Sequence, residues 1–307
     1  MTPIHLTAAY GLDLAAGDPE WFPHPVRLFG ALIRAGERRL LVVRRGPEWE
    51  TFAGAALTAA IVGLAWSSGR SRHWISQVLL AWTTLATRSL LDEADSVIRA
   101  LEAGNLTIAR IRLSRIVGRD TANLDESEVA RAVIETLAES ACDGIVAPLF
   151  WLAAAGVPGA MAYKAANTLD SMIGHPEPPH QYFGRVAACL DDLANLLPAR
   201  LTAIAISAAA GIHSLQGRQA LRIWWRDGGR HASPNAGQSE AAMAGALGVR
   251  LGGANWYDGL LHEAPQLHSE GRQPNAHDAR TARTLVATVS LLAFGVGLLC
   301  SFWSRRK

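Results

Sequence analysis

The stretch "TLVATVSLLAFGVGLLCSFW", residues 284–303, decides the class of fold. It runs for about 20 residues without a charged side chain, and an apolar helix of about that length can cross the roughly 30 Å hydrocarbon layer of a bilayer. Four further apolar runs precede it, at 52–68, 74–91, 144–163 and 193–212. Together the five runs predict a polytopic integral membrane protein in which residues 1–307 form a single membrane-embedded domain.

The five runs differ in strength. Residues 52–68 and 74–91 are shorter and more polar than the last run, and they predict a helical hairpin with Trp residues at the membrane interface. Residues 144–163 and 193–212 carry Pro or Arg inside, so each is either a full span or a helix that is buried in protein or dips partway into the bilayer. The polar segments expected to carry function are about 11–47, 92–143, 164–192 and 214–283.

Composition limits the class of protein. The chain has 307 residues, 50% of them apolar, with a net charge of +2 and a mean hydropathy of +0.12. Its basic residues are spread among acidic ones, so no nucleic-acid partner is expected. Three widely spaced cysteines argue against a disulfide framework and a structural zinc site. The first 20 residues lack Lys and Arg, so we expect no secretory signal there.

Arginines indicate the sidedness of the chain. One group precedes the first apolar run and another lies within 214–283, which predicts that both segments are cytoplasmic. The basic ending "SRRK" would then lie outside if all five runs crossed the membrane. We expect the cell inner membrane as the location, several crossings, and an active site on the cytoplasmic side.

The polar segments show helical periodicity. "LDEADSVIRALEAGN" places its apolar residues on one face and ends near Gly104, a common signal for a helix C-terminus. "DESEVARAVIETLAES" opens with Asp125 and has Glu128 three positions later, which is the spacing of a capping box. No alternating strand pattern bounded by turn signals is evident. The predicted fold class is therefore all-α, with helical cytoplasmic segments between the apolar runs.

The second of these helices carries a ladder of carboxylates. Glu135, Glu139 and Asp143 are spaced by four, so they share one face if the helix continues. Such a ladder can hold Mg²⁺ by one or two oxygens while the metal keeps waters and binds substrate phosphates. A solvated helix face with Glu–Arg pairs explains the same spacing.

Three further polar stretches are candidates for a site. "GRDTANLDE" supplies Arg119 for a phosphate or carboxylate, with Asp120 and Thr121 as a metal ligand or helix cap, or it is an ordinary loop. Polar groups at the end of an apolar run are a functional-site hypothesis because their desolvation is costly. Such groups follow the run at 144–163, namely Lys164, Asn167, Thr168, Asp170, Ser171, Asp191, Asp192, Asn195 and Arg200. The third stretch, "SPNAGQSE", forms a turn with Ser233 and Asn235 ahead of a helix.

Several long strings resemble one protein family. They are "GDPEWFPHPVRLFG", "GRDTANLDESEVARAVIETLAES", "DGIVAPLFWLAAAGVPGAMAYKAANTLDSMIGH", "YFGRVAACLDDLANLLPARLTA" and "SPNAGQSEAAMAGALGVRLGG". They are similar to the CbiB/CobD family of cobalamin biosynthesis, the adenosylcobinamide-phosphate synthases. The resemblance covers most of residues 11–260. The sequence departs from the family's usual pattern at Ser140, where Asn is common, and at Gln238-Ser239, where Tyr-Pro is often found.

The resemblance implies an integral membrane enzyme. Such an enzyme uses ATP and Mg²⁺ to join adenosylcobyric acid to (R)-1-aminopropan-2-ol or its O-phosphate, giving adenosylcobinamide or its phosphate. The implied partners are these substrates, the lipid bilayer and later membrane enzymes of the cobalamin pathway. A corrinoid-binding membrane carrier or scaffold without catalysis is the competing hypothesis, and it predicts corrinoid binding that does not depend on ATP.

The candidate residues take expected roles on this basis. We expect catalysis from Glu135, Glu139, Lys164 and Asp170, and magnesium binding from Asp120, Glu135, Glu139 and Asp143. We expect substrate binding from Asp18, His24, Arg27, Arg119, Thr121, Asn167, Thr168, Ser171, Asp191, Asp192, Arg200, Ser233 and Asn235. These polar clusters are expected to converge at one pocket at the membrane edge.

Overall fold

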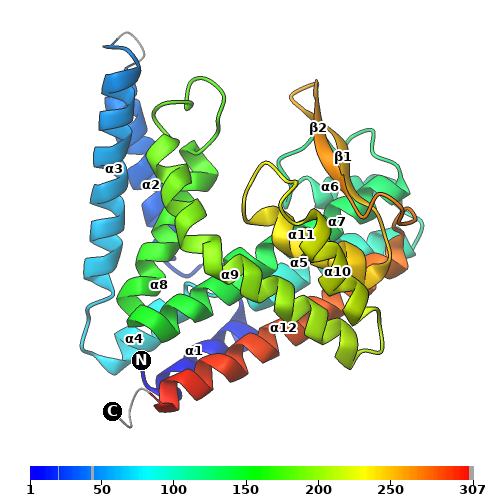
Figure 1. The fold of residues 1–307 in the computed structure, drawn as a ribbon. Helices are drawn as coiled ribbons and strands as arrows, with labels where there is room; N and C mark the ends of the chain where they lie inside the picture. The colour runs from blue at the N-terminus through cyan, green and yellow to red at the C-terminus, as the bar shows by residue number, and fades with distance from the viewer. Residues whose placement is uncertain (20, 43–44, 304–307) are drawn as a thin grey trace. The chain divides into compact units, whose positions relative to one another are not determined.

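The fold is built mainly from helices, which confirms the predicted class. The structure is a computed structural model that describes residues 1–19, 21–42 and 45–303, with 71% of the chain in helices and 6% in strands. The elements in chain order are α1 (Pro3–Ala16), α2 (Pro25–Leu40), α3 (Pro47–Ser68), α4 (Trp74–Trp82), α5 (Thr87–Glu102), α6 (Leu106–Leu113), α7 (Glu126–Ala141), the π-turn η2 (Cys142–Val146), α8 (Ala147–Ile173), α9 (Arg185–Ile212), α10 (Gly217–Asp227), α11 (Ala236–Leu247), β1 (Leu251–Tyr257), β2 (Leu260–Leu267) and α12 (Ala276–Trp303) (Figure 1).

The chain divides into two compact units. The first unit comprises Met1–Ala86, Ala147–Asn195 and Phe294–Lys307, and the second comprises Thr87–Val146 and Leu196–Ala293. The predicted single domain over 1–307 stays a prediction, and each unit is described by itself below.

Four helical segments are long and apolar enough to cross a membrane. They are Pro47–Ser68, Glu126–Ile173, Arg185–Ile212 and Ala276–Trp303. Four of the five predicted runs fall within these segments. For these four runs, the predicted helix of spanning length is therefore present in the structure.

The fifth run, 74–91, does not form one helix, so the second arm of the predicted helical hairpin is wrong. Helix α4 ends after nine residues, and α5 begins only at Thr87. The hydroxyls of Thr83 and Thr84 donate to the carbonyl oxygens of Leu80 and Ala81, at 2.8 and 2.7 Å, in the last turn of α4. Such bonds from side chain to backbone compete with the helical ladder and suit a helix end.

The segment Glu126–Ile173 is helical throughout but irregular. The π-turn η2 follows α7, and Gly156 within α8 takes φ +68° and ψ −162° two residues before Pro158. A positive φ favours glycine, and proline cannot donate to the helical ladder, so the two residues account for the kink.

In the first unit, α3 packs against α2 and α8, and α1 packs against α4. A Cβ atom on Gly54 of α3 would lie 1.8 Å from the carbonyl oxygen of Phe183, whose side chain is fully buried. Trp82 of α4 donates its indole N–H to the carbonyl oxygen of Gly17 at 3.1 Å, which ties α4 to the end of α1. Helix α3 can therefore approach the backbone at Phe183 only because residue 54 has no side chain.

In the second unit, α5 packs against α6 and α7, and α11 packs against α7 and α10 (Figure 1). The predicted capping box of α7 is confirmed. Asp125 Oδ1 accepts the backbone N–H of Glu128, and Glu128 Oε2 accepts the backbone N–H of Asp125, both at 2.8 Å. The box satisfies two backbone donors at the start of the helix that carries the carboxylate ladder.

A β-hairpin departs from the predicted absence of strands. Strands β1 and β2 pair antiparallel, with Tyr257 opposite Leu260. The two residues between them, Asp258 and Gly259, take φ +49° and +76°. Asp-Gly is a strong signal for a two-residue hairpin turn. Most side chains of the hairpin are exposed, so its flanks lack the apolar alternation that would have marked two strands.

The contact at Gly54 gives a first prediction. Gly54→Ala should lower the midpoint of thermal unfolding in detergent, because overpacking against backbone typically costs about 1–3 kcal/mol. Gly63→Ala is the matched control on the same helix, since a Cβ there meets no atom within 4 Å. The control should be neutral or slightly stabilising, given alanine's better helix propensity. Equal midpoints for the two variants would contradict the packing described here.

Candidate functional site

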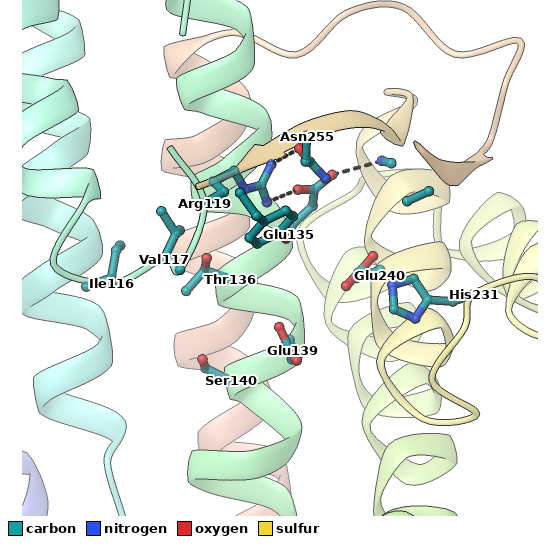
Figure 2. A pocket seen from close by; sticks show the side chains of 14 residues that line it. Ile116, Val117, Arg119, Glu135, Thr136, Glu139, Ser140, His231, Glu240 and Asn255 are labelled. Carbon is teal, nitrogen blue, oxygen red and sulfur yellow. Dashed lines mark hydrogen bonds and ion pairs between the residues drawn. The ribbon is translucent and has the colours of Figure 1, made fainter. Parts of the chain in front are cut away.

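A polar pocket of about 300 Å³ lies in the second unit (Figure 2). Its walls come from the loop before α7, from α7 itself, from the loop and first turns of α11, and from the β-hairpin. The polar side chains that line it are Arg119, Glu135, Thr136, Glu139, Ser140, His231, Glu240, Asn255 and Tyr257. The loop before α7 and α7 itself thus meet segments that begin at His231, 91 positions after Ser140.

A buried ion pair holds the top of the pocket together. Arg119 donates to Glu135 Oε2, and its other terminal nitrogen donates to Asn255 Oδ1 at 2.6 Å (Figure 2). Glu135 Oε1 accepts the backbone N–H of Gly252 at 2.8 Å. The side chains of Arg119 and Glu135 are 9% and 8% exposed. Each carboxylate oxygen of Glu135 therefore has a donor, as a buried charge requires.

A second arginine fixes the hairpin to α7. Arg131 donates to the carbonyl oxygen of Gly252 and, at 2.9 Å, to that of Ala254. Gly252 and Gly253 have φ of +76° and +90°, and a Cβ on Gly252 would lie 2.2 Å from the carbonyl oxygen of Pro265. Only glycine takes this backbone path at low cost, so the Gly-Gly pair lets the hairpin present its backbone to Glu135 and Arg131.

The pocket contains two further carboxylates besides Glu135. Glu139 and Glu240 both line it, and Arg119, the cationic lining side chain, is already paired with Glu135. Glu240 is 6% exposed, and its carboxylate accepts no hydrogen bond from any residue in the described part of the chain. Burial raises the pKa of Glu240 well above its usual range, the charges of Glu135 and Glu139 raise it further, and Arg119 opposes the shift. A cation bound here would offset this repulsion.

His231 stands next to Glu240 in the pocket (Figure 2). The backbone N–H of Ser233 donates to His231 Nδ1 at 3.0 Å, so the neutral ring carries its proton on Nε2. Burial lowers the pKa of His231, which favours this neutral form. A Cβ on Gly237 would lie 2.5 Å from Cβ of His231, so Gly237 allows the loop that carries His231 to lie against α11. The imidazole is thereby oriented as a hydrogen-bond donor.

Of the four carboxylates predicted to bind a metal, two line the pocket. Glu135 and Glu139 line the pocket, but Asp120 accepts the backbone N–H of Gly259 at 2.8 Å and secures the hairpin turn instead. Asp143 lies in η2, where the π-turn shifts the helical face on which the ladder was expected to continue. Within residues 1–19, 21–42 and 45–303, no three His, Cys, Asp or Glu side chains form a group able to hold a metal ion.

The remaining candidates of the second unit serve the framework around the pocket. The hydroxyl of Ser233 accepts the N–H groups of Asn235 and Ala236 at 3.2 Å, at the start of α11. Arg200 donates to the carbonyl oxygen of Leu196 at 2.6 Å and to Asn235 Oδ1 at 3.4 Å. Thr121 is buried in the loop before α7. None of these predicted binding residues is among those that line the pocket.

The first unit contains a separate polar cluster between α8 and α9. Tyr163 donates to Asn195 Oδ1 at 2.9 Å, and the Asn195 amide donates to Asp191 Oδ2 at 3.0 Å. The Asn167 amide nitrogen lies 3.4 Å from Asp191 Oδ1. The hydroxyls of neighbouring α8 residues bond within the helix, Thr168 to the carbonyl oxygen of Lys164 and Ser171 to that of Asn167. Lys164, Asp170 and Asp192 belong to the same two helices. Apart from Arg200, the candidates of this second stretch therefore lie within the first unit.

The N-terminal candidates also lie in the first unit. His24 Nε2 is 3.2 Å from Asp18 Oδ1, and His24 Nδ1 accepts the backbone N–H of Val26 at 3.3 Å. His24 is thus the N-cap of α2, and Arg27 lies in the first turn of that helix. Convergence of the two units' polar clusters at one pocket stays a prediction.

The polar residues of the pocket lining that were not predicted as site residues are Thr136, Ser140, His231, Glu240, Asn255 and Tyr257. Asn255 and Tyr257 lie in the hairpin, which was not predicted. Ser140 was noted only as a departure from the family's pattern. Thr136 and Ser140 directly follow Glu135 and Glu139 on α7, so helical periodicity could have predicted them. The others line the pocket because of which distant segments pack against α7.

The fold and the pocket define a mainly helical protein with four helices capable of crossing a membrane and an acidic, partly ion-paired pocket. A model of the family described as CobD/Cbib protein matches residues 6–286. The protein named cobalamin biosynthesis protein CobD of Yersinia enterocolitica is 44% identical over 297 residues, 93% of each chain. Cobalamin biosynthesis protein CbiB of Salmonella typhimurium is 42% identical over 316 residues, 98% of each chain. No solved structure matches the chain. The chain belongs to the CobD/CbiB family, as the sequence analysis predicted.

The raised pKa of Glu240 gives a prediction on pH. The folded protein holds a proton on Glu240 more tightly than the unfolded chain does, so it loses stability as the pH rises above the ordinary Glu pKa of about 4.3. Glu240→Gln removes this loss. In magnesium-free buffer, its thermal midpoint should exceed that of the wild type by an amount that grows from about pH 4.5 to about pH 7.5.

Glu270→Gln is the control for this measurement. The Arg226 side chain lowers the pKa of the exposed Glu270 to about 2, so Glu270 stabilises the fold above its ordinary pKa and the effect is lost only in strong acid. The control midpoint should lie at or below that of the wild type, with a constant difference across the same pH range. A constant difference for Glu240→Gln as well would contradict the assignment.

Proposed function

We propose that this protein is an adenosylcobinamide-phosphate synthase, an acid–amine ligase of cobalamin biosynthesis. It joins a carboxylate of adenosylcobyric acid to the amine of (R)-1-aminopropan-2-ol or its O-phosphate, and ATP drives the reaction. The observation that carries the proposal is the buried carboxylate of Glu240, which lines one pocket with Glu139 and the fixed cation Arg119 in a member of the CobD/CbiB family.

The chemistry requires activation of a poor electrophile. ATP must convert the carboxylate to a better acylating group, with an acyl phosphate as the expected form, and phosphoryl transfer depends on cations placed around the transferred group. Arg119 is held rigidly by Glu135 and Asn255, so it can face an anion without reorganising. His231 presents its Nε2–H and can donate to a phosphate oxygen.

The donor set fits Mg²⁺ bound together with a nucleotide. Mg²⁺ keeps several waters and usually takes only one or two protein carboxylates along with substrate phosphates, so a cluster of three protein ligands is not required. Glu139 and Glu240 would hold the ion, which supplies charge neutralisation at the phosphates. The buried Glu240, without a hydrogen-bond donor among the described residues, is the group that such a cation would stabilise.

The size of the pocket suits the smaller reactants. A volume of about 300 Å³ lies at the lower end of the range for ligand pockets, about 300–1,000 Å³, which is enough for part of a nucleotide or for the amine but not for a corrin ring. A carboxylate also has to act as base, because the amine must be neutral when it attacks. Glu139 would take the proton of the amine as its nitrogen attacks the acyl phosphate, and the phosphate would leave with the electron pair of the broken C–O bond. The corrin macrocycle would remain outside the pocket, with only its side-chain carboxylate entering.

For the polar cluster of the first unit, the expected roles stand as proposals of their own. Lys164 and Asp170 retain their expected catalytic roles, and Asn167, Asp191 and Asp192 retain their roles in substrate binding. Asn167 and Asp191 belong to the hydrogen-bonded network that includes Tyr163 and Asn195. The expected location is the inner membrane with the site on the cytoplasmic side, where later membrane enzymes of the pathway can receive the product.

Amide formation is the direct test. Purified protein is incubated with adenosylcobyric acid, aminopropanol O-phosphate and Mg-ATP, and the amide is measured by mass spectrometry. Glu139→Gln should lower kcat by at least about a hundredfold, because a group that acts in proton transfer contributes about 10²–10⁴-fold. Glu126→Gln, an exposed carboxylate at the start of the same helix, should retain wild-type activity. ATP-independent corrinoid binding without amide would favour a carrier or scaffold instead.

Magnesium dependence separates the role of Glu240 from that of Glu139. Glu240→Gln should raise the Mg²⁺ concentration needed for half-maximal activity by at least about tenfold, as loss of groups at metal sites commonly does. The KM for the corrinoid should be unchanged, because the macrocycle lies outside the pocket. An unchanged Mg²⁺ requirement in this variant would remove Glu240 from the metal site.

A further inference from the structure

An apolar groove lies in the second unit where α9 meets α10. It has a volume of about 690 Å³. Its lining includes Ile204, Ala208, Gly211, Leu215, Arg218 and Leu221. The groove is mostly apolar, with an arginine in its wall, and it runs along the last turns of a helix that is long and apolar enough to cross a membrane.

A tight turn forms the closed end of the groove. After α9 ends at Ile212, Ser214 takes φ +57°, and the backbone N–H of Leu215 donates to the carbonyl oxygen of Ala210 at 2.8 Å. A Cβ on Gly217 would lie 2.7 Å from the carbonyl oxygen of Ser207. Glycine therefore lets the start of α10 lie directly on the end of α9, and the two helices share one surface.

The outer face of α10 is both apolar and basic. Ala220 and Ile223 are buried on its inner face, whereas Leu221 and Trp225 are 45% and 87% exposed. Arg218 and Arg222 are exposed as well. Arg218 precedes Leu221 by three positions and Arg222 precedes Trp225 by three, and each like pair is spaced by four, so all four lie on one face. A helix that lies in the membrane interface typically exposes Trp and Leu next to Arg on one face, as α10 does.

The arginines of this region are not equivalent. Arg226 pairs with Asp227 at 2.7 Å and with Glu270 at 2.5 Å, and Arg230 pairs with Asp227 at 3.3 Å. In the described part of the chain, by contrast, neither Arg218 nor Arg222 has an ion-pair or hydrogen-bond partner. Arg218 lines the apolar groove, and Arg222 follows one helical turn later on α10, so the two cations match a ligand with an anionic head and an apolar tail.

We propose that this groove binds an anionic phospholipid, with an acyl chain along α9 and the phosphate on Arg218 and Arg222. A protein that crosses a bilayer meets lipid along all of its spans. The unpaired arginines add a preference for an anionic headgroup at this one place. The site belongs to neither the pocket around Glu240 nor the polar cluster of α8 and α9.

Lipid retention by the full-length protein in detergent tests the headgroup. Native mass spectrometry would compare phosphatidylglycerol with phosphatidylcholine of the same acyl chains. The wild type should retain the anionic lipid preferentially. In R218Q/R222Q the ratio of anionic to zwitterionic lipid retained should fall about fivefold for each arginine replaced, which is the effect of one basic residue near an anionic surface. Arg99→Gln, an exposed arginine on α5, is the control and should keep it. Equal retention of the two lipids by the wild type would overturn the proposal.

A second variant tests the acyl chain. A Cβ on Gly211 meets no atom within 4 Å, so Gly211→Leu fills the groove without a clash. It should reduce retention of phosphatidylglycerol at an unchanged thermal midpoint, whereas Gly63→Leu, equally open but on α3, should not. sn-Glycerol 3-phosphate and inorganic phosphate should compete poorly. Complete displacement of the lipid by either, or full retention by Gly211→Leu, would show a phosphate site without a chain site and overturn the proposal.

Discussion

The pocket of the second unit depends on one buried ion pair, Arg119–Glu135. The pair joins the loop before α7 to α7 itself and, through Asn255 and Gly252, to the β-hairpin. Charges removed from water lose hydration free energy, and only a close partner with well-directed hydrogen bonds compensates for the loss. Each oxygen of Glu135 has such a donor. The hairpin must therefore lie where both bonds can form, and this constraint fixes one wall of the pocket.

The same pocket contains a buried carboxylate, Glu240, that accepts no hydrogen bond from any residue in the described part of the chain. Glu240 is buried beside Glu139 and Glu135, and the nearest lining cation is committed to Glu135. Folding the chain around three carboxylates is unfavourable, and such an arrangement is characteristic of a site whose cation arrives with a ligand. His231, held neutral by burial and oriented by Ser233, adds a donor without adding charge. Stability and ligand binding are thus coupled at one group, Glu240.

Local signals in the sequence were the most reliable guide to the fold. Four apolar runs predicted helices that are long enough to span, because helix length and hydropathy are properties of contiguous residues. The capping box at Asp125 and Glu128 was predicted for the same reason. The prediction of one helix over 74–91 was wrong. The hydroxyls of Thr83 and Thr84 bond to backbone carbonyl groups of the preceding turn where α4 ends, and hydropathy does not register such bonds.

The sequence by itself determined the helical class, the family, the spans and the placement of Glu135 and Glu139 on one face of a helix, because a period of 3.6 residues orders neighbours along the chain. Only the tertiary structure decided which of the predicted carboxylates share a pocket. Asp120 accepts a hydrogen bond from the hairpin turn and Asp143 lies in the π-turn outside the pocket lining, while Glu240, about 100 residues from Glu139, lines the same pocket as Glu139. Burial and hydrogen bonds between distant segments determine which carboxylates line the pocket, and local spacing in the sequence carries no information on either.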